Sequence, residues 1–170
     1  MQIVIGTTPD RSNWLAECAA SIGRPFIAVS NYGYELGKIR WVMENTNIER
    51  FLFLQDSVII KSDAFWDLLE GYDGSVSINQ DPTYYGSYMG VYERAILKHL
   101  DLPVMETKRD AVTHEVDWAR RYIQVGGIVP VMFPTLRDGE EFEVHHGRMN
   151  MVIENDYIKK YKGTWSYDQL

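Results

Sequence analysis

The chain reads RFLFLQDSVII over residues 50–60. Four consecutive apolar residues in this stretch lead directly into Gln55, Asp56 and Ser57, and a second apolar run follows at once. A continuous apolar run of this kind is typical of a strand that is buried on both faces of a sheet. Because an unpaired charge in a core is strongly unfavourable, we expect Asp56 to reach the open edge of the sheet, where α/β proteins bind their ligands.

The flanking sequence alternates between predicted strands and predicted helices. We expect strands over residues 2–6, 26–29, 50–55 and 75–79, and helices over residues 13–22, 35–45 and 62–70. Further along, we expect an aromatic loop at 84–90, helices at 92–100 and 113–123, and a strand at 128–133. This order predicts an α/β fold with a mostly parallel central sheet and helices on both faces, forming one domain over residues 1–170.

Composition limits the classes of function. The 45% hydrophobic and 24% charged content is typical of a globular protein, and no apolar stretch reaches the roughly 18 residues of a membrane span. Cys18 is the only cysteine and no signal peptide opens the chain, so we expect a buried, unreactive thiol and a reducing, cytoplasmic location. The net charge of −7 argues against broad binding to a nucleic-acid backbone, whereas the mildly basic segment from His145 onward suits a small anionic ligand.

Five segments carry a resemblance to a known family. They are IVIGTT at 3–8, QDS at 55–57, HEVDW at 114–118, the histidine pair at 145–146 and KKYKGTW at 159–165. Their order along nearly the whole chain resembles that of the GT-A glycosyltransferases, which use nucleotide-sugar donors. The resemblance implies a Rossmann-like GT-A fold. It also implies transfer of a sugar from a nucleoside-diphosphate sugar to an acceptor such as a glycan or protein hydroxyl, or a modified DNA base.

The resemblance assigns roles to particular residues. Asp56, His145 and His146 would hold a divalent metal, Mn²⁺ or Mg²⁺, on the donor diphosphate, although the family motif usually has two acidic residues where this chain has one. Asp117 or Glu115 would be the catalytic base, and we favour Asp117 because Trp118 beside it would shield the site. The nucleotide-sugar donor would contact Thr7, Thr8, Asn31, Lys38, Gln55, Lys159, Lys162 and Trp165.

Each assignment has a structural alternative. Asp56 could instead cap the turn that follows it, and Glu115 and Asp117 could be helix-terminal charges favoured by the macrodipole. The lysine-rich segment could be a solvated face.

Two other functions stay open. A nucleotide- or sugar-binding module without catalysis would fit the single acidic residue of the motif and the short chain. A nucleotidyltransferase ranks third, because GTTPDR at 6–11 is a poor match to the Gly-rich, basic loop expected after its first strand.

Overall fold

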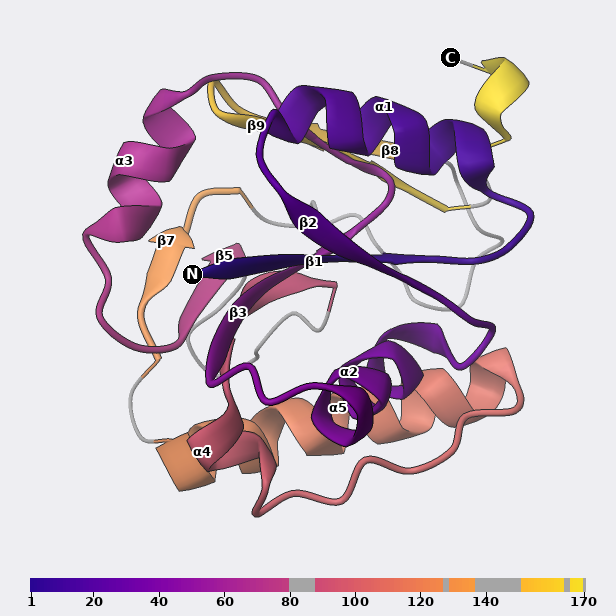
Figure 1. Cartoon of the computed structure of the whole chain (residues 1–170), viewed down its shortest axis with the longest axis vertical. Coiled ribbons are helices and arrows are strands. Elements are labelled where there is room, and N and C mark those ends of the chain that lie inside the picture. Colours follow the sequence, from indigo (N-terminus) through magenta and orange to yellow (C-terminus); the bar gives the residue numbers. More distant parts are fainter. Residues whose placement is uncertain (80–87, 127–128, 137–150, 164–165, 170) are drawn as a thin grey trace.

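The computed structural model describes residues 1–79, 88–126, 129–136, 151–163 and 166–169 (Figure 1). The strands are β1 Gln2–Thr7, β2 Phe26–Ser30, β3 Arg50–Gln55, β4 Val58–Ile60, β5 Val76–Asn79, β6 Met89–Glu93, β7 Val131–Phe133, β8 Met151–Glu154 and β9 Ile158–Lys162. The α-helices are α1 Ser12–Ile22, α2 Tyr34–Asn45, α3 Ala64–Glu70, α4 Arg94–Leu97 and α5 Lys108–Gly126, and a short 3₁₀ helix covers Tyr167–Gln169. No helix in these ranges combines the length and the apolar content needed to cross a bilayer.

The central sheet has the strand order β2-β1-β3-β6-β5-β7. β1 pairs in parallel with both β2 and β3, and β5 pairs in parallel with β7, whereas β6 is antiparallel to its neighbours β3 and β5. The predicted α/β class is therefore confirmed, and the sheet is mixed because β6 runs against the other described strands. Gly6 of β1 lies opposite Gln55 of β3, so these two strands end together at one edge of the sheet.

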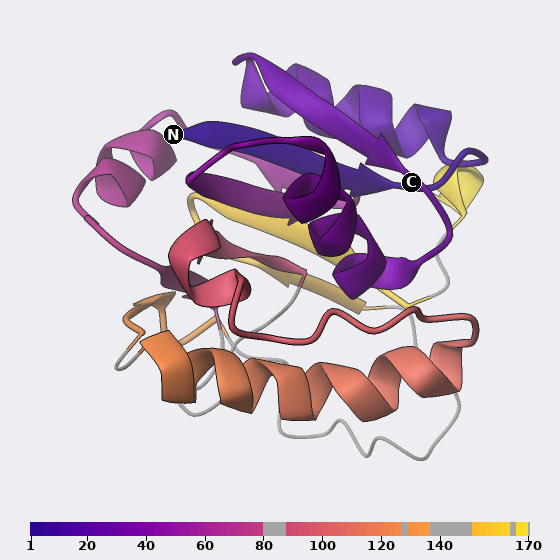
Figure 2. The same cartoon turned by 60° about the horizontal axis from the view of Figure 1, so that its bottom comes forward.

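The two faces of the sheet build two hydrophobic cores, because successive residues of a strand point to opposite faces. Ile5 and Leu54 pack on one side in a cluster shared with α1, α3 and the smaller sheet. Val4 and Phe53 pack on the other side with α2 and α5. Figures 1 and 2 show α1 on one face of the sheet and α2, α4 and α5 on the other. The prediction of a strand buried on both faces is confirmed for β3, whose residues 51–54 are fully buried.

A second sheet of order β4-β9-β8 is wholly antiparallel and lies beside α1 (Figure 1). Val58 pairs with Lys160, and the backbone N–H of Tyr161 donates to the carbonyl of Ser57 at 3.0 Å. The segment that follows Asp56 is thus joined to the C-terminal segment by strand pairing. The lysines of β9 are thereby carried to the edge where β1 and β3 end.

One predicted helix was wrong in part. We expected a helix over residues 92–100, but Tyr92 belongs to strand β6, and α4 covers only Arg94–Leu97. Tyr92 pairs with Phe51 across the sheet, and its ring packs against Trp118 and Tyr122. Burial in the middle of a mixed sheet overrides the helical spacing of the apolar residues in this stretch.

Candidate functional site

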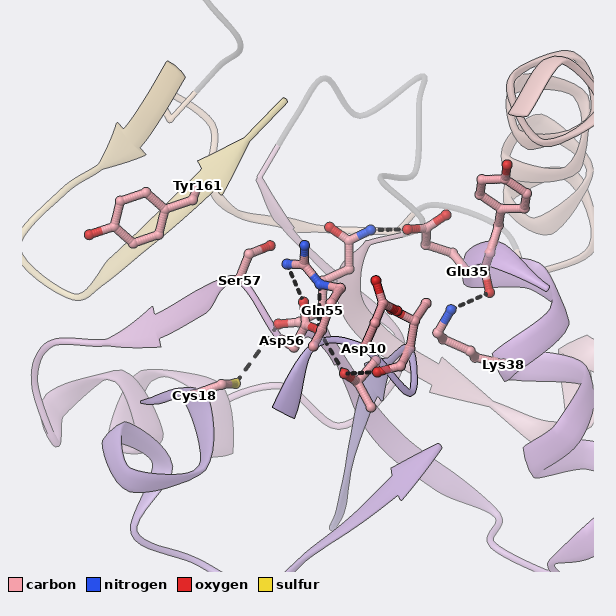
Figure 3. A network of polar contacts seen from close by, with 12 residues as sticks. Asp10, Cys18, Glu35, Lys38, Gln55, Asp56, Ser57 and Tyr161 are labelled. Carbon is pink, nitrogen blue, oxygen red and sulfur yellow. Dashed lines mark hydrogen bonds and ion pairs between the residues drawn. The ribbon is translucent and has the colours of Figure 1, made fainter. Parts of the chain in front are cut away.

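A cavity of about 700 Å³ opens where β1 and β3 end. Its lining comes from the loop after β1 with the first turn of α1, the loop before α2 with its first turns, the turn between β3 and β4, Tyr88 before β6, the start of α5 with Glu106 before it, and strand β9 with Gly163. Figure 3 shows Glu35, Gln55, Asp56 and Ser57 near one another, with the hydrogen bond between Gln55 and Glu35 dashed. The position is the one at which α/β sheets bind ligands, as the sequence predicts for Asp56.

Asp56 is buried, with 3% of its surface exposed, and it is fully engaged. Nε of Arg11 donates to Oδ2 and Nη2 of Arg11 donates to Oδ1, both at 2.8 Å, and the Thr7 hydroxyl donates to Oδ2 at 2.8 Å. The bidentate pair with Arg11 and the hydrogen bond from Thr7 together offset the cost of burying the carboxylate charge. Sequence reasoning had not singled out Arg11, because no local pattern links it to a carboxylate 45 residues away.

This arrangement does not fit a divalent metal on Asp56. Both carboxylate oxygens already accept hydrogen bonds, and a metal ion there would face the positive guanidinium of Arg11. Within the described ranges, no group of three or more His, Cys, Asp or Glu side chains is placed to hold a metal. His145 and His146, the other predicted ligands, lie outside the described residues.

Lys160 is the most buried cation of the cavity. Its Nζ donates to Oε1 of Gln55, to the Ser57 hydroxyl and, at 3.0 Å, to the carbonyl of Tyr161. Burial lowers its pKa from 10.5 to about 7. Gln55 also donates through Nε2 to the Glu35 carboxylate, so its amide bridges an anionic and a cationic side chain.

Two of the three lysines of β9 line the cavity. Lys160 and Lys162 line it, and the Nζ of Lys162 lies 4.9 Å from the centre of the Tyr88 ring. Lys159 does not line it and instead places its Nζ 4.7 Å from the centre of the Tyr161 ring. The sequence predicts that Lys159 and Lys162 contact the ligand. In the structure Lys162 lines the cavity as predicted, and Lys160 lines it in place of Lys159. Trp165 lies outside the described residues.

Lys38 reaches the cavity across a glycine. Its Nζ donates to the Tyr34 carbonyl at 3.1 Å, and burial lowers its pKa. A Cβ on Gly6 would lie 2.6 Å from Cδ of Lys38 and 2.6 Å from Cζ of Phe53, so only glycine leaves room for this crossing. Tyr34 has φ of 54°, a strained value for a residue other than glycine, and such strain is frequent next to ligand sites.

The other predicted contacts divide between the cavity and its surroundings. Thr7 and Thr8 line the cavity, and the Thr8 hydroxyl donates to Oδ1 of Asp10 at 2.6 Å. Asn31 does not line it, and its side-chain oxygen accepts from the backbone N–H of Gly33 at 2.9 Å. Asn31 therefore shapes the loop before α2, which is a structural role.

The two candidate bases lie on different sides of α5. Glu115 lines the cavity, whereas the Asp117 side chain is 71% exposed and lies 3.9 Å from Arg120. Glu115 shares the inward face of the helix with Trp118, which follows three residues later and is buried in the core. Trp118 therefore does not shield Asp117, and the geometry does not bring Asp117 to the cavity.

Cys18 is fully buried, and burial raises the pKa of its thiol to about 12. Its Sγ lies 3.8 Å from the Gln55 carbonyl (Figure 3). The predicted burial of the thiol is confirmed, and the raised pKa keeps it protonated.

Comparison with known proteins gives little further information. No protein-family model and no curated protein matches the chain. Among solved structures, A197 from STIV aligns with a TM-score of 0.42 and 13% sequence identity, over 61% of this chain and 70% of that one.

Proposed function

We propose that this chain is a glycosyltransferase that uses a nucleoside-diphosphate sugar, with the donor held in the cavity at the ends of β1 and β3. The observation that carries the proposal is convergence. Residues from four of the five segments that resemble GT-A glycosyltransferases line this one cavity: Thr7, Asp56, Glu115, Lys160 and Lys162 among them. These segments are far apart in the chain, and a single ligand that contacts all of them would explain why they line the same cavity.

The charge of the lining suits a diphosphate. The cavity is lined by five Lys or Arg side chains and four Asp or Glu side chains, although the whole chain has a net charge of −7. Arg11 and Asp56 pair with each other, which leaves four cationic and three anionic side chains, an excess of one positive charge when Lys160 is protonated. A locally cationic cleft in an acidic protein concentrates an anionic ligand and favours its entry.

The lining also offers surfaces for the nucleoside and the sugar. Tyr32 and Tyr34 line the cavity together with the hydroxyl groups of Thr7 and Thr8 in the loop after β1. Flat rings bind bases and sugars through their faces, and hydroxyls supply directional hydrogen bonds.

The proposed chemistry uses groups of this chain. Sugar transfer builds negative charge on the departing diphosphate, and Lys160 and Lys162 would stabilise that charge. Glu115 would take the proton from the attacking acceptor hydroxyl, since it lines the cavity and Asp117 does not. The described donor set does not fit a divalent metal, so these cationic side chains would supply the stabilisation of the leaving group.

The direct test is donor turnover by the purified protein. UDP-, GDP-, CDP-, ADP- and dTDP-linked sugars are offered with glycan, peptide and modified-DNA acceptors, and release of the nucleoside diphosphate is measured. We expect one donor to be consumed, and we expect Lys162→Ala to reduce its affinity by about tenfold or more. Lys159→Ala is the matched control on the same strand and should leave turnover unchanged. Absence of binding for every donor would overturn the proposal.

A nucleotide-binding module without catalysis is the second candidate. The engagement of both Asp56 oxygens by Arg11 favours it, because the predicted motif carboxylate then serves structure. The same experiment separates the two, since a binder would show donor affinity without any product.

A further inference from the structure

We propose that Arg11 is the resident cation of this site, so that the phosphates of the ligand bind to its guanidinium and no divalent metal is required. In this arrangement Asp56 holds the cation in place. The identity of the ligand as a nucleoside diphosphate rests on the proposed function, whereas the role of Arg11 rests on the geometry below.

The guanidinium is fixed from two sides. Asp56 accepts from Nε and Nη2 on one edge, and the ring of Trp14 lies under the guanidinium, with Cζ of Arg11 4.8 Å from the ring centre. The Thr7 hydroxyl in turn fixes the Asp56 carboxylate. A cation oriented in advance loses little freedom when it meets an anion.

The guanidinium keeps donors for a ligand. It carries five N–H groups, and Asp56 takes two of them. Among the residues that the structure describes, Asp56 is the hydrogen-bond acceptor of the Arg11 guanidinium, so three of its N–H groups remain. The side chain is 30% exposed and lines the cavity, and a planar fork of donors suits phosphate oxygens.

The charges favour this reading over a metal on Asp56. The carboxylate side chain is 5% exposed, so it has no room to turn to a metal while keeping Arg11. A metal that took over the carboxylate would leave the guanidinium unpaired beside a divalent cation, which adds repulsion to the loss of the bidentate pair. An anion that binds Arg11 can also contact Lys160 and Lys162 in the same cavity, and it leaves the pair between Arg11 and Asp56 intact.

Isothermal titration calorimetry tests the proposal. Pyrophosphate and the five common nucleoside diphosphates are titrated into the full chain, once with EDTA and once with excess Mn²⁺. We expect at least one of them to bind in EDTA, with a Kd within about threefold of its value in Mn²⁺. Binding that appears only with Mn²⁺ would overturn the role of Arg11 and leave the glycosyltransferase proposal standing. Metal-independent binding without sugar transfer would support the role of Arg11 and contradict the glycosyltransferase proposal. Absence of binding in both buffers would overturn the inference.

Two variants separate binding from folding. Arg11→Met should weaken binding in EDTA by about tenfold or more. Arg24→Met is the matched control, because Arg24 also lies over a tryptophan, Trp66, at 4.5 Å and also pairs with a carboxylate, Glu70, at 3.4 Å, but does not line the cavity.

The double variant Arg11→Met with Asp56→Asn removes both charges, so no buried carboxylate is left unpaired. It should fold, by circular dichroism, and still fail to bind in EDTA. A folded double variant with the affinity of the wild type would show that Arg11 only neutralises Asp56, and the inference would fall. Binding of the wild type only in Mn²⁺ would overturn the inference whether or not these variants fold.

Discussion

Arg11 and Asp56 form a bidentate ion pair, with two N···O distances of 2.8 Å, that joins the loop after β1 to the end of β3. The carboxylate is enclosed, with 5% of its side chain exposed, whereas the Arg11 side chain is 30% exposed on the cavity side. The pair links the stability of the fold to the chemistry of the cavity, because the residues that close the sheet edge also line the site.

Removal of Asp56 should destabilise the protein. Asp56→Ala leaves the Arg11 guanidinium and the buried Thr7 hydroxyl without their acceptor, and because Arg11 can turn to the solvent of the cavity we expect a cost of about 1–3 kcal/mol. Urea unfolding followed by circular dichroism measures the change. Asp117→Ala, which removes an exposed pair with Arg120 at 3.9 Å, should change the free energy of unfolding by less than about 0.5 kcal/mol. Equal effects of the two substitutions would contradict the buried pair.

Lys160 should make stability depend on pH. Burial lowers its pKa from 10.5 to about 7 in the folded state, so between these values the unfolded chain binds the extra proton. The free energy of unfolding therefore gains a contribution that rises with pH over this window. Compared with Lys160→Met, the wild type should become relatively more stable from pH 7 to pH 10. Lys159→Met keeps the buried amine of Lys160, so it should track the wild type from pH 7 to pH 10. A wild type that lost stability relative to Lys160→Met as pH rises would refute the assignment.

The same lysine should couple ligand binding to pH. A bound phosphate favours the charged amine, so binding draws a proton onto Lys160, and affinity should fall as pH rises above about 7. A nucleoside diphosphate keeps nearly constant charge above this pH, since its last phosphate ionises near pH 6. Titrations at pH 7, 8 and 9 measure the slope, and Lys160→Met should flatten it. An equally steep slope in the variant would assign the effect to another group.

Gly6 should not tolerate a methyl group. A Cβ there would lie 2.6 Å from atoms of Lys38 and of Phe53, and overpacking of this kind destabilises by about 1–3 kcal/mol. Gly37→Ala is the control. Its added Cβ would meet only the Asn31 side-chain oxygen at 3.8 Å, and alanine in a helix is favoured over glycine by about 0.5–1 kcal/mol. Thermal unfolding should therefore move in opposite directions for the two variants, and a shared direction would contradict the crossing of Lys38 over Gly6.

Glu115 should affect turnover and not donor affinity. If it is the base, Glu115→Gln keeps the shape of the side chain and lowers kcat by about a hundredfold or more. Donor binding should stay within about twofold, and Asp117→Asn should leave both quantities unchanged. An unaltered kcat in Glu115→Gln would remove it from the proposed mechanism.

The sequence by itself determined the local elements and the edge at which the site lies. The apolar run before Gln55 predicts β3 because continuous burial needs continuous apolar side chains, and a carboxylate after it belongs at the open end. The helices that became α1, α2 and α5 follow from local spacing in the same way, although α5 is longer than the predicted range. Tyr92 departs from its predicted helix because its partners on the neighbouring strand and on α5 are distant in sequence.

The tertiary structure alone decided the partners of the site residues. The register between β1 and β3 brings Arg11 to Asp56, and the pairing of β9 with β4 directs Lys160, in place of Lys159, into the cavity. The packing of Trp118 turns Glu115 inward and leaves Asp117 on the surface. Neighbouring residues of a strand or helix carry nearly the same local signal. Which of them faces the cavity is set by the rotation and pairing of whole elements, and those depend on contacts between segments far apart in the chain.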